Sequence, residues 1–302
     1  MKQLNIAHFS KNSNTNVARE RRNIGYFSYA VPEFEWDHFV IGGSIDRKQF
    51  RDYDLIFIEE GGKPLEKINP GAPVAYLSYD STLSGQHYQD RLRRAAVSDL
   101  ILVDHDKLER FEHLGKPVRR LNYCVNENVF KPLEKNLDVC FMCSGGGTNN
   151  LPGGKERAEL RIFLGEYCEE NGLSYKSGSG GLDEYAEAMG HARVVVNLPR
   201  TPTNRPHRVF DAMACGACLL TYPIPFIEED ELDHFTHAVI TDAEDINSWL
   251  RELFINDLSS DRNVIELWGN YAIYGNNFIS KKHTWSIRAK QLRQTLNEEL
   301  GL

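Results

Sequence analysis

The sequence predicts an α/β protein with two domains, each built on a parallel β-sheet. The chain of 302 residues is long enough for two hydrophobic cores. Short apolar runs alternate with helical stretches, as is typical of parallel sheets with helices on their faces. A polar segment at 126–137, which contains a proline, separates two such series. We therefore expect a first domain at 1–125, a linker at 126–137, a second domain at 138–280 and a last helix within 281–302.

The first series contains six strand-like runs, with helical stretches at 89–97 and 107–114. In parallel sheets, ligands bind beyond the carboxyl ends of the strands. Two polar residues follow strands there, and Asp80 and His105 are candidates for a general base or a sugar contact. His105 also fits a helix start. The runs are 4–9, 38–41, 54–59, 74–78, 100–103 and 118–124.

The second series opens with an apolar strand at 138–143 and a glycine-rich loop that contains Gly145 and Gly146. Such a backbone can approach a ligand closely. The loop matches neither a dinucleotide-binding nor a P-loop motif, so nicotinamide and P-loop chemistry are not supported. A helix at about 155–171 follows and carries Arg157 and Arg161. Later strands are expected at 173–176, 192–196, 217–221 and 238–241, and helices at 182–189, 208–215, 246–254, 264–278 and 284–300.

Residues 197–221 form the most informative stretch. A loop with three prolines and three arginines joins a buried strand to an apolar helix, which Gly216 should cap. A strand, a loop and a helix start together predict an anion site, to which Arg205 and Arg208 would add positive charge. Asp211 is suited to the hydroxyls of a ribose. The alternative is an ordinary β–α–β unit with solvated arginines.

Composition excludes several classes of protein. The net charge of −8 argues against a general nucleic-acid coat, although a local basic cleft remains compatible with it. No apolar run approaches the roughly 18 residues that span a bilayer, and the first residues do not form a secretory signal. We therefore expect a cytoplasmic protein with no membrane span.

Two Cys-x-x-Cys pairs, 140/143 and 215/218, mimic a zinc ribbon. The first pair falls in a predicted strand, where an offset of three residues points the side chains to opposite faces. In the second pair, Cys215 falls at the end of a predicted helix and Cys218 at the start of a predicted strand. We therefore expect buried free thiols and no metal.

Three stretches carry a family resemblance: RVFDAMACGACLLT (208–221), LNYCVNENVFKP (121–132) and KKHTWSIRAKQL (281–292). They resemble the retaining group-1 glycosyltransferases of GT-B architecture, and most closely the spore-maturation-protein-like (CgeB-type) branch. The resemblance covers the C-terminal half well and the N-terminal half poorly. It implies two Rossmann-like domains and a C-terminal helix that crosses back to the first domain. Trp285, Ala289, Leu292 and Leu296 would share one side of that helix.

The resemblance implies transfer of a hexosyl or pentosyl group from a nucleotide sugar, which is a substrate, with no cofactor. In the resembled family a basic residue near a helix start meets the donor diphosphate, and we assign that role to Arg157, with Lys155 second. The family's Glu-x7-Glu pair falls on Thr203 and Asp211, so the first acid is absent. The expected donor-binding set is Gly145, Gly146, Arg157, Arg205, His207, Arg208 and Asp211.

The resemblance also implies retention at the anomeric carbon without a metal. If the enzyme inverts instead, Asp80 is the expected base. Asp-x-Asp triplets at 52–54 and 104–106 could hold a cation, but their places at a strand entry and a strand-to-helix turn favour structural roles. A non-catalytic sugar-nucleotide-binding protein and an epimerase are the alternatives.

The sequence does not identify the acceptor. A basic helix after the first strand carries Arg19, Arg21 and Arg22 on what would be the acceptor side, which suggests an acidic acceptor. One alternative is DNA with hydroxymethylated bases, which phage enzymes of this architecture glycosylate. Arg21 and Arg22 are the expected acceptor-side residues, with Arg91, Arg93 and Arg94 as further candidates for a phosphate-binding face.

Overall fold

The chain folds into two compact units. The first comprises Met1–Cys124 with Trp285–Leu302, and the second comprises Val125–Thr284. This computed structural model describes residues 3–10, 34–40, 50–59, 71–78, 86–104, 108–143, 153–199, 206–224, 232, 238–241, 245–254 and 267–302. Within these ranges, no helix combines the length and the apolar character needed to cross a membrane.

The first unit is built on a six-stranded sheet of order β2-β1-β3-β4-β5-β6, in which every neighbouring pair is parallel. Its central strands are apolar on both faces, as expected for a sheet covered twice. The strands are β1 (Leu4–Ser10), β2 (Phe34–Val40), β3 (Leu55–Glu59), β4 (Val74–Ser78), β5 (Leu100–Val103) and β6 (Val118–Arg120).

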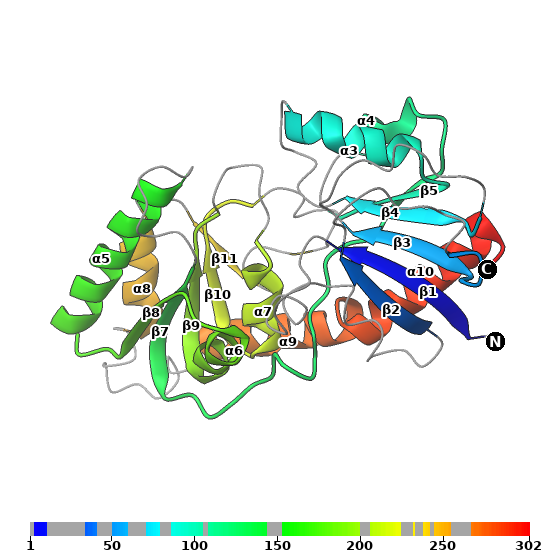
Figure 1. The fold of residues 1–302 in the computed structure, drawn as a ribbon. Helices are drawn as coiled ribbons and strands as arrows, with labels where there is room; N and C mark the ends of the chain where they lie inside the picture. The colour runs from blue at the N-terminus through cyan, green and yellow to red at the C-terminus, as the bar shows by residue number, and fades with distance from the viewer. Residues whose placement is uncertain are drawn as a thin grey trace. The chain divides into compact units, whose positions relative to one another are not determined.

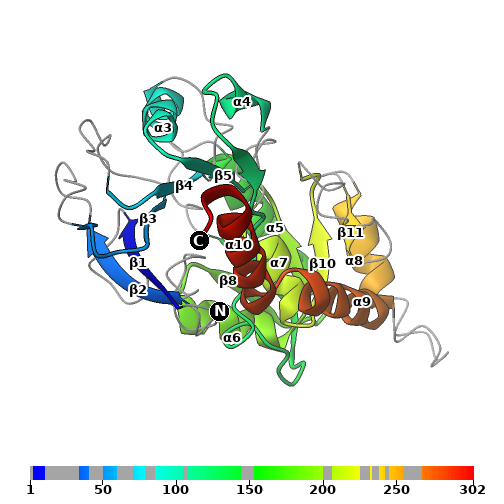
Figure 2. The ribbon, with the colours of Figure 1, turned by 90° about the vertical axis from the view of Figure 1, so that its right-hand side faces the viewer.

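Helices cover both faces of this first sheet (Figures 1 and 2). Ala95 of α3 (Gln86–Ala96) and Phe111 of α4 (Glu109–Glu112) pack on one face. The last helix, α10 (Trp285–Leu300), packs on the other through Trp285, Ala289, Leu292 and Leu296. The prediction that these four residues share a buried side, and that the last helix returns to the first domain, is confirmed.

The second unit contains a five-stranded parallel sheet of order β11-β10-β9-β7-β8. In both sheets the first strand of the series lies between the second and the third, which is the doubly wound order. The strands are β7 (Leu137–Met142), β8 (Tyr175–Gly178), β9 (Ala192–Asn197), β10 (Cys218–Thr221) and β11 (Val239–Ile240).

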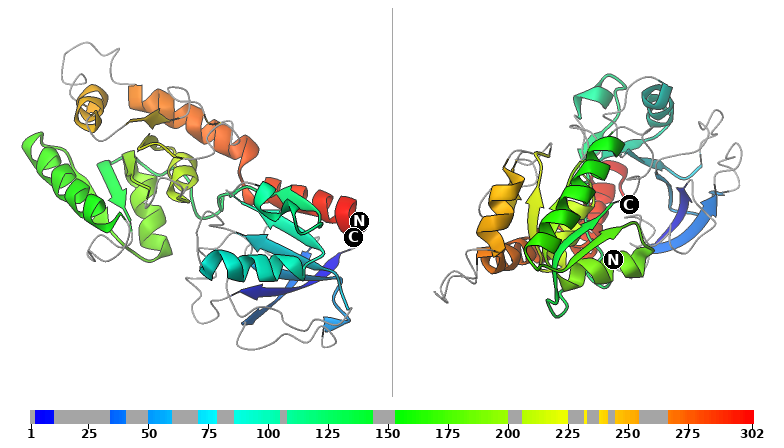
Figure 3. Two further views of the ribbon diagram at one scale, coloured as in Figure 1. Left: turned by 90° about the horizontal axis from the view of Figure 1, so that it is seen from above. Right: turned by 90° about the vertical axis from the view of Figure 1, so that its left-hand side faces the viewer.

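Two helices, α5 (Gly154–Glu170) and α8 (Ile246–Phe254), cover one face of the second sheet, where Leu164 and Leu250 are fully buried. They stand in front of the strands in Figure 3, right. The other face is covered by α6 (Leu182–His191) and α7 (Arg208–Ala214), and α9 (Leu267–Lys282) packs beside α7. The chain then runs from α9 into α10 (Figure 3, left).

The segment expected to be an interdomain linker belongs to the second unit. Lys135 Nζ donates hydrogen bonds to the carbonyl oxygens of Gly190 (2.8 Å) and Cys215 (2.7 Å), at the ends of α6 and α7. The negative ends of two helix dipoles favour a cation at this position. The backbone N–H of Leu133 also donates to Gly190. Lys135, at least, therefore caps two helices of the second unit.

Gly216 ends α7 as predicted. Its φ of 63° lies in the left-handed region, which favours glycine. The N–H of Gly216 donates to the carbonyl of Met213, and the N–H of Ala217 donates to that of Ala212, which together form a Schellman motif. A Cβ atom at Gly216 would lie 3.1 Å from Cγ of Pro132, so the cap is also a close packing site.

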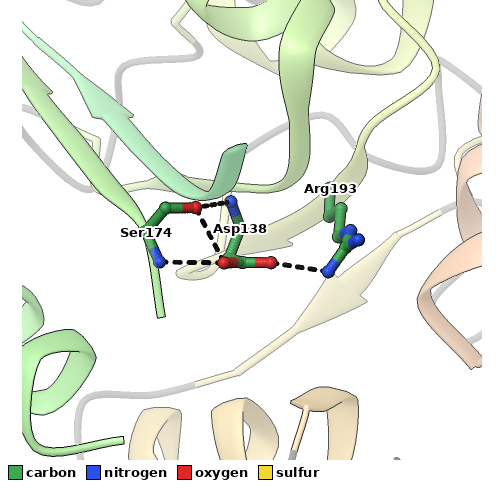
Figure 4. Close-up of polar contacts among 3 residues, drawn as sticks. All are labelled: Asp138, Ser174 and Arg193. Atoms are coloured by element: carbon green, nitrogen blue, oxygen red, sulfur yellow. Dashed lines mark hydrogen bonds and ion pairs between the residues drawn. The ribbon is translucent and has the colours of Figure 1, made fainter. Parts of the chain in front are cut away.

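A polar cluster ties the amino ends of three strands of the second sheet together (Figure 4). Asp138 at the start of β7 accepts from the N–H (2.8 Å) and hydroxyl (2.7 Å) of Ser174 and pairs with Arg193 of β9 at 2.7 Å. Arg193 also lies 5.9 Å from the ring centroid of Trp268 in α9. The cluster lies opposite the ligand-binding edge of the sheet, so its role is structural.

Several predicted boundaries were wrong by a few residues, and one strand was too long. The expected strand 118–124 ends at Arg120, because the N–H of Tyr123 donates to the Asp104 carboxylate at 2.6 Å instead of to a neighbouring strand. The expected helix 107–114 has its α-helical part at Glu109–Glu112 only. The strand expected at 38–41 begins earlier, at Phe34.

Candidate functional site

The carboxyl edge of the second sheet gathers three arginines. At this edge, β7 and β9 are neighbours, and the chain leaves them toward opposite faces, which is where doubly wound sheets bind ligands. Arg157 and Arg161 reach the edge from α5, and Arg208 reaches it from the first turn of α7. The arrangement brings together positive charges that are far apart in the sequence.

Arg208 is 6% exposed, and its Nη1 donates to the amide oxygen of Asn197 at 2.9 Å. Asn197, the last residue of β9, in turn donates from Nδ2 to the hydroxyl of Thr221 at 2.8 Å. Thr221, the last residue of β10, donates to the carbonyl of Tyr222 at 2.8 Å. This chain of hydrogen bonds holds the guanidinium at the ends of two adjacent strands.

The two α5 arginines bind backbone at the ends of the flanking strands. Arg157, also 6% exposed, donates from Nε (3.3 Å) and Nη2 (3.0 Å) to the carbonyl of Leu198, just after β9. Arg161 donates to the carbonyl of Cys143, just after β7, at 3.3 Å. Lys155, the second choice from the sequence, is 77% exposed and pairs with Glu159, so Arg157 is the better candidate.

Asp211 lies one turn beyond Arg208 and is buried. Its Oδ2 accepts a hydrogen bond from the hydroxyl of Tyr185 in α6 at 3.3 Å. Burial raises the pKa of Tyr185 well above 10, and the charge of Asp211 adds to the rise. Tyr185 therefore stays protonated and can donate to the carboxylate. Its ring packs edge-on against Phe130, with centroids 5.9 Å apart.

The side chains, more than the helix, supply the positive charge of this site. The helix α7 has seven residues, fewer than the sequence predicted, so its dipole is a weak basis for anion binding. Arg208 is buried beside a neutral amide, and no carboxylate pairs with it in the described parts of the chain. A buried cation with a neutral partner is costly unless an anion completes its environment. The site is therefore suited to a phosphate or diphosphate.

Several predicted site residues lie outside the described residues: Asp80, Gly145, Gly146, Arg205, Arg21 and Arg22, together with Arg19, His105 and Thr203. Of the expected donor-binding set, the structure describes Arg157, His207, Arg208 and Asp211. His207 is exposed at the start of α7. Arg208 and Asp211 lie on successive turns of one helix. Arg157 binds the carbonyl of Leu198, the residue that follows Asn197.

Several described polar residues of the first unit have structural partners. Asp54 accepts from the N–H of Asn5 at 2.9 Å, and Asp104 accepts from Tyr123, so these members of the two Asp-x-Asp triplets hold backbone, as expected. At the carboxyl edge of this sheet, His8 of β1 and Glu59 of β3 form a buried pair at 3.0 Å. No cluster of metal-ligating side chains occurs among the residues that the structure describes.

The six cysteines are free and buried. Burial raises the pKa of Cys140 to about 12, although nearby Arg208 opposes the rise, and it raises the pKa values of Cys215 and Cys218 as well. Val139, Phe141 and Cys143 belong to the core beneath α5, whereas Cys140 does not, so the first pair points to opposite faces as predicted. Thiols of this kind are unreactive packing groups.

The phosphate-binding face expected on α3 stays a prediction, and two of its three arginines have little exposed surface. Arg91 and Arg94 are buried, at 6% and 7% exposure. Arg93 is exposed but lies 3.6 Å from Asp90. The sequence suggested that these arginines form an exposed face of the helix, whereas Arg91 and Arg94 are buried.

Sequence reasoning missed three residues of the site. Asn197 and Thr221 look like ordinary strand ends, and Arg161 looks like one more charge on a long helix. For Asn197 and Thr221, the available signal was their position at the ends of apolar strands, because polar residues there face the ligand-binding edge.

The two units define the class of protein. Each is a Rossmann-like α/β fold with a parallel sheet, and together they match GT-B glycosyltransferase structures over nearly the whole chain. Residues 127–294 match the family described as glycosyl transferase-like. The chain belongs to this family. A comparison with curated protein sequences found no match.

Similar solved structures include HepE from Anabaena in complex with UDP, with 11% identity, a TM-score of 0.64 and coverage of 99% of this chain and 100% of that one. Sucrose-phosphate synthase from Thermosynechococcus elongatus is 12% identical, with a TM-score of 0.61 and 99% coverage of both chains. An α-glucosyltransferase in complex with UDP and a 13-mer DNA containing an HMU base is 13% identical, with a TM-score of 0.61 and 98% and 100% coverage. At these identities the likeness shows the fold alone.

Proposed function

We propose that this chain is a glycosyltransferase that moves a sugar from a nucleotide-sugar donor to an acceptor. The observation that carries the proposal is the convergence of Arg157, Arg161 and Arg208 at the carboxyl edge of the second sheet. Bound UDP in the similar HepE structures supports a uridine diphosphate donor as the first candidate. Asp211 is proposed to contact the ribose.

We propose that the reaction retains the anomeric configuration and needs no metal. The arginines can stabilise the charge that develops on the leaving diphosphate, which is the usual task of a divalent cation in such transfers. Retention rests on the resemblance of residues 208–221 to the retaining group-1 enzymes, and so does assignment to the spore-maturation-protein-like branch. Asp80 remains the proposed base for the inverting alternative.

The acceptor has no comparable support. The DNA-bound α-glucosyltransferase has a TM-score of 0.61, and sucrose-phosphate synthase has the same value, so the likeness does not favour DNA. The case for a DNA-binding face rests on Arg21 and Arg22, with the α3 arginines as further candidates. Transfer to DNA with hydroxymethylated bases is therefore a secondary candidate.

The test is a panel of nucleotide sugars, scored by thermal stabilisation and by release of the nucleoside diphosphate with and without EDTA. A donor at a hundred times its dissociation constant should stabilise the protein by about 2.7 kcal/mol. Arg208→Lys should weaken that stabilisation, since one ammonium cannot hold both Asn197 and a phosphate as a guanidinium does. Lys155→Met, on the exposed side of α5, is the matched control and should behave as wild type.

Two results would contradict the proposal. One is the absence of both stabilisation and turnover with every donor in the panel. The other is a donor that binds Arg208→Lys as tightly as wild type, which would place the site elsewhere. Loss of activity in EDTA, restored by a divalent cation, would contradict metal independence alone.

A further inference from the structure

The hydrogen bonds behind Arg208 have a fixed direction. Asn197 and Thr221 are both fully buried and are register partners on adjacent strands. The Asn197 amide oxygen accepts from Arg208, while its NH2 group donates to Thr221. The Thr221 hydroxyl accepts that bond and donates its own hydrogen bond to the carbonyl of Tyr222. The flipped amide would place NH2 against the guanidinium, with two donors facing each other.

The partner of Arg208 is neutral, and this is unusual for a buried guanidinium. Buried arginines are commonly paired with carboxylates, which satisfy their bonds and cancel their charge. An aspartate at position 197 would have nearly the same shape and would form a stronger bond. With asparagine there, the guanidinium is held in place but keeps its full charge. Its Nε, which is buried, has no hydrogen-bond partner among the described residues.

We infer that Asn197, oriented by Thr221, is a positioning residue that aims the Arg208 guanidinium at the donor diphosphate and leaves its charge free for it. This inference rests on the proposed function. It assigns a role to two residues that do not touch the donor themselves. It also explains why an amide, and not a carboxylate, ends β9.

The decisive variant is Asn197→Asp, compared with wild type by calorimetric titration with UDP and with uridine. The new carboxylate can accept from both Arg208 and the Thr221 hydroxyl, so we expect the variant to fold with a melting temperature no lower than that of wild type. Affinity for UDP should drop about tenfold or more, because the new carboxylate offsets the charge of the guanidinium and weakens its charge-assisted bond to phosphate. Affinity for uridine, which has no phosphate, should be unchanged.

Three further variants complete the test. Asn270→Asp places the same charge on the exposed side of α9 and should bind both ligands as wild type does. Thr221→Val removes the hydroxyl that orients the amide and should weaken UDP binding a few-fold, whereas Thr221→Ser should restore it. These two also test the chain of hydrogen bonds if Asn197→Asp does not fold.

The outcomes separate this inference from the proposed function. Wild-type protein that binds neither UDP nor uridine, nor any other donor nucleotide, would overturn the proposed function and this inference with it. If wild type binds UDP and Arg208→Lys weakens binding, but Asn197→Asp binds UDP normally, the inference alone is wrong. Equal losses for UDP and uridine in Asn197→Asp would also overturn it, because they would indicate a merely structural role.

Discussion

Lys135→Met tests whether the segment 126–137 is held to the second unit as the structure indicates. The change removes the hydrogen bonds to the carbonyls of Gly190 and Cys215. A hydrogen bond from a charged group contributes about 1.5–3 kcal/mol. The Gly190 carbonyl keeps its bond from Leu133, so the loss of bonding should amount to about 2–4 kcal/mol.

Desolvation of the ammonium works against this contribution. Burial lowers the pKa of Lys135 from 10.5 to about 8 in the folded protein, and this effect outweighs the opposing one of nearby Cys215. A lowering of this size is equivalent to about 3 kcal/mol for a fully buried group, and partial exposure reduces it to about 1–2 kcal/mol. At pH 7 the two effects partly cancel, and Lys135→Met should cost only about 1–2 kcal/mol.

The cost should grow as the pH rises. Because the folded pKa lies below the unfolded value, the unfolded chain binds more protons between pH 8 and pH 10.5, and wild-type stability increases across that window. A neutral amine still has two N–H donors for the two carbonyls. Lys135→Met cannot titrate, so its deficit relative to wild type should be larger at pH 9.5 than at pH 7.

The assay is urea unfolding followed by tryptophan fluorescence at pH 7 and pH 9.5. The exposed Lys131→Met serves as the control, with a change within about 0.5 kcal/mol at both pH values. A deficit for Lys135→Met that is constant or shrinks with pH would refute the desolvation argument. A variant as stable as Lys131→Met at both pH values would refute the contacts themselves.

Two stability predictions concern other parts of the second unit. Gly216→Ala should destabilise the protein by about 1–2 kcal/mol because alanine is strained in the left-handed region, and the contact with Pro132 should add to this cost. Gly172 has a similar φ, but no atom of the described residues lies near the position of an added Cβ. Comparing the melting temperatures of Gly216→Ala and Gly172→Ala therefore isolates the cost of the contact. Asp138→Ala removes the hydrogen bonds to Ser174 and the ion pair with Arg193, and should lower stability by about 1–3 kcal/mol. Asp183→Ala, at an exposed position, should leave stability unchanged. Equal melting temperatures for the two variants would argue against a structural role of the Asp138 cluster.

The sequence by itself determined the features that depend on neighbouring residues. Apolar runs bounded by polar residues predicted most strands, helical spacing predicted the buried side of α10, and a glycine after an apolar helix predicted the cap at Gly216. These signals are local, because side-chain direction alternates or repeats every two to four residues and a helix cap involves only a few neighbouring residues. The motif at 208–221 likewise indicated the family from one continuous stretch.

Only the tertiary structure decided which distant residues meet. Lys135 contacts carbonyls 55 and 80 positions away, and Asn197 reaches a hydroxyl 24 positions away, through a strand order that periodicity does not specify. Arg94 and Arg208 look alike in the sequence and are both buried, but only Arg208 lies at the carboxyl edge of the second sheet, where it contacts Asn197. Charge and spacing predicted an anion site, and the order of the strands decided which arginines lie at the carboxyl edge where it is proposed.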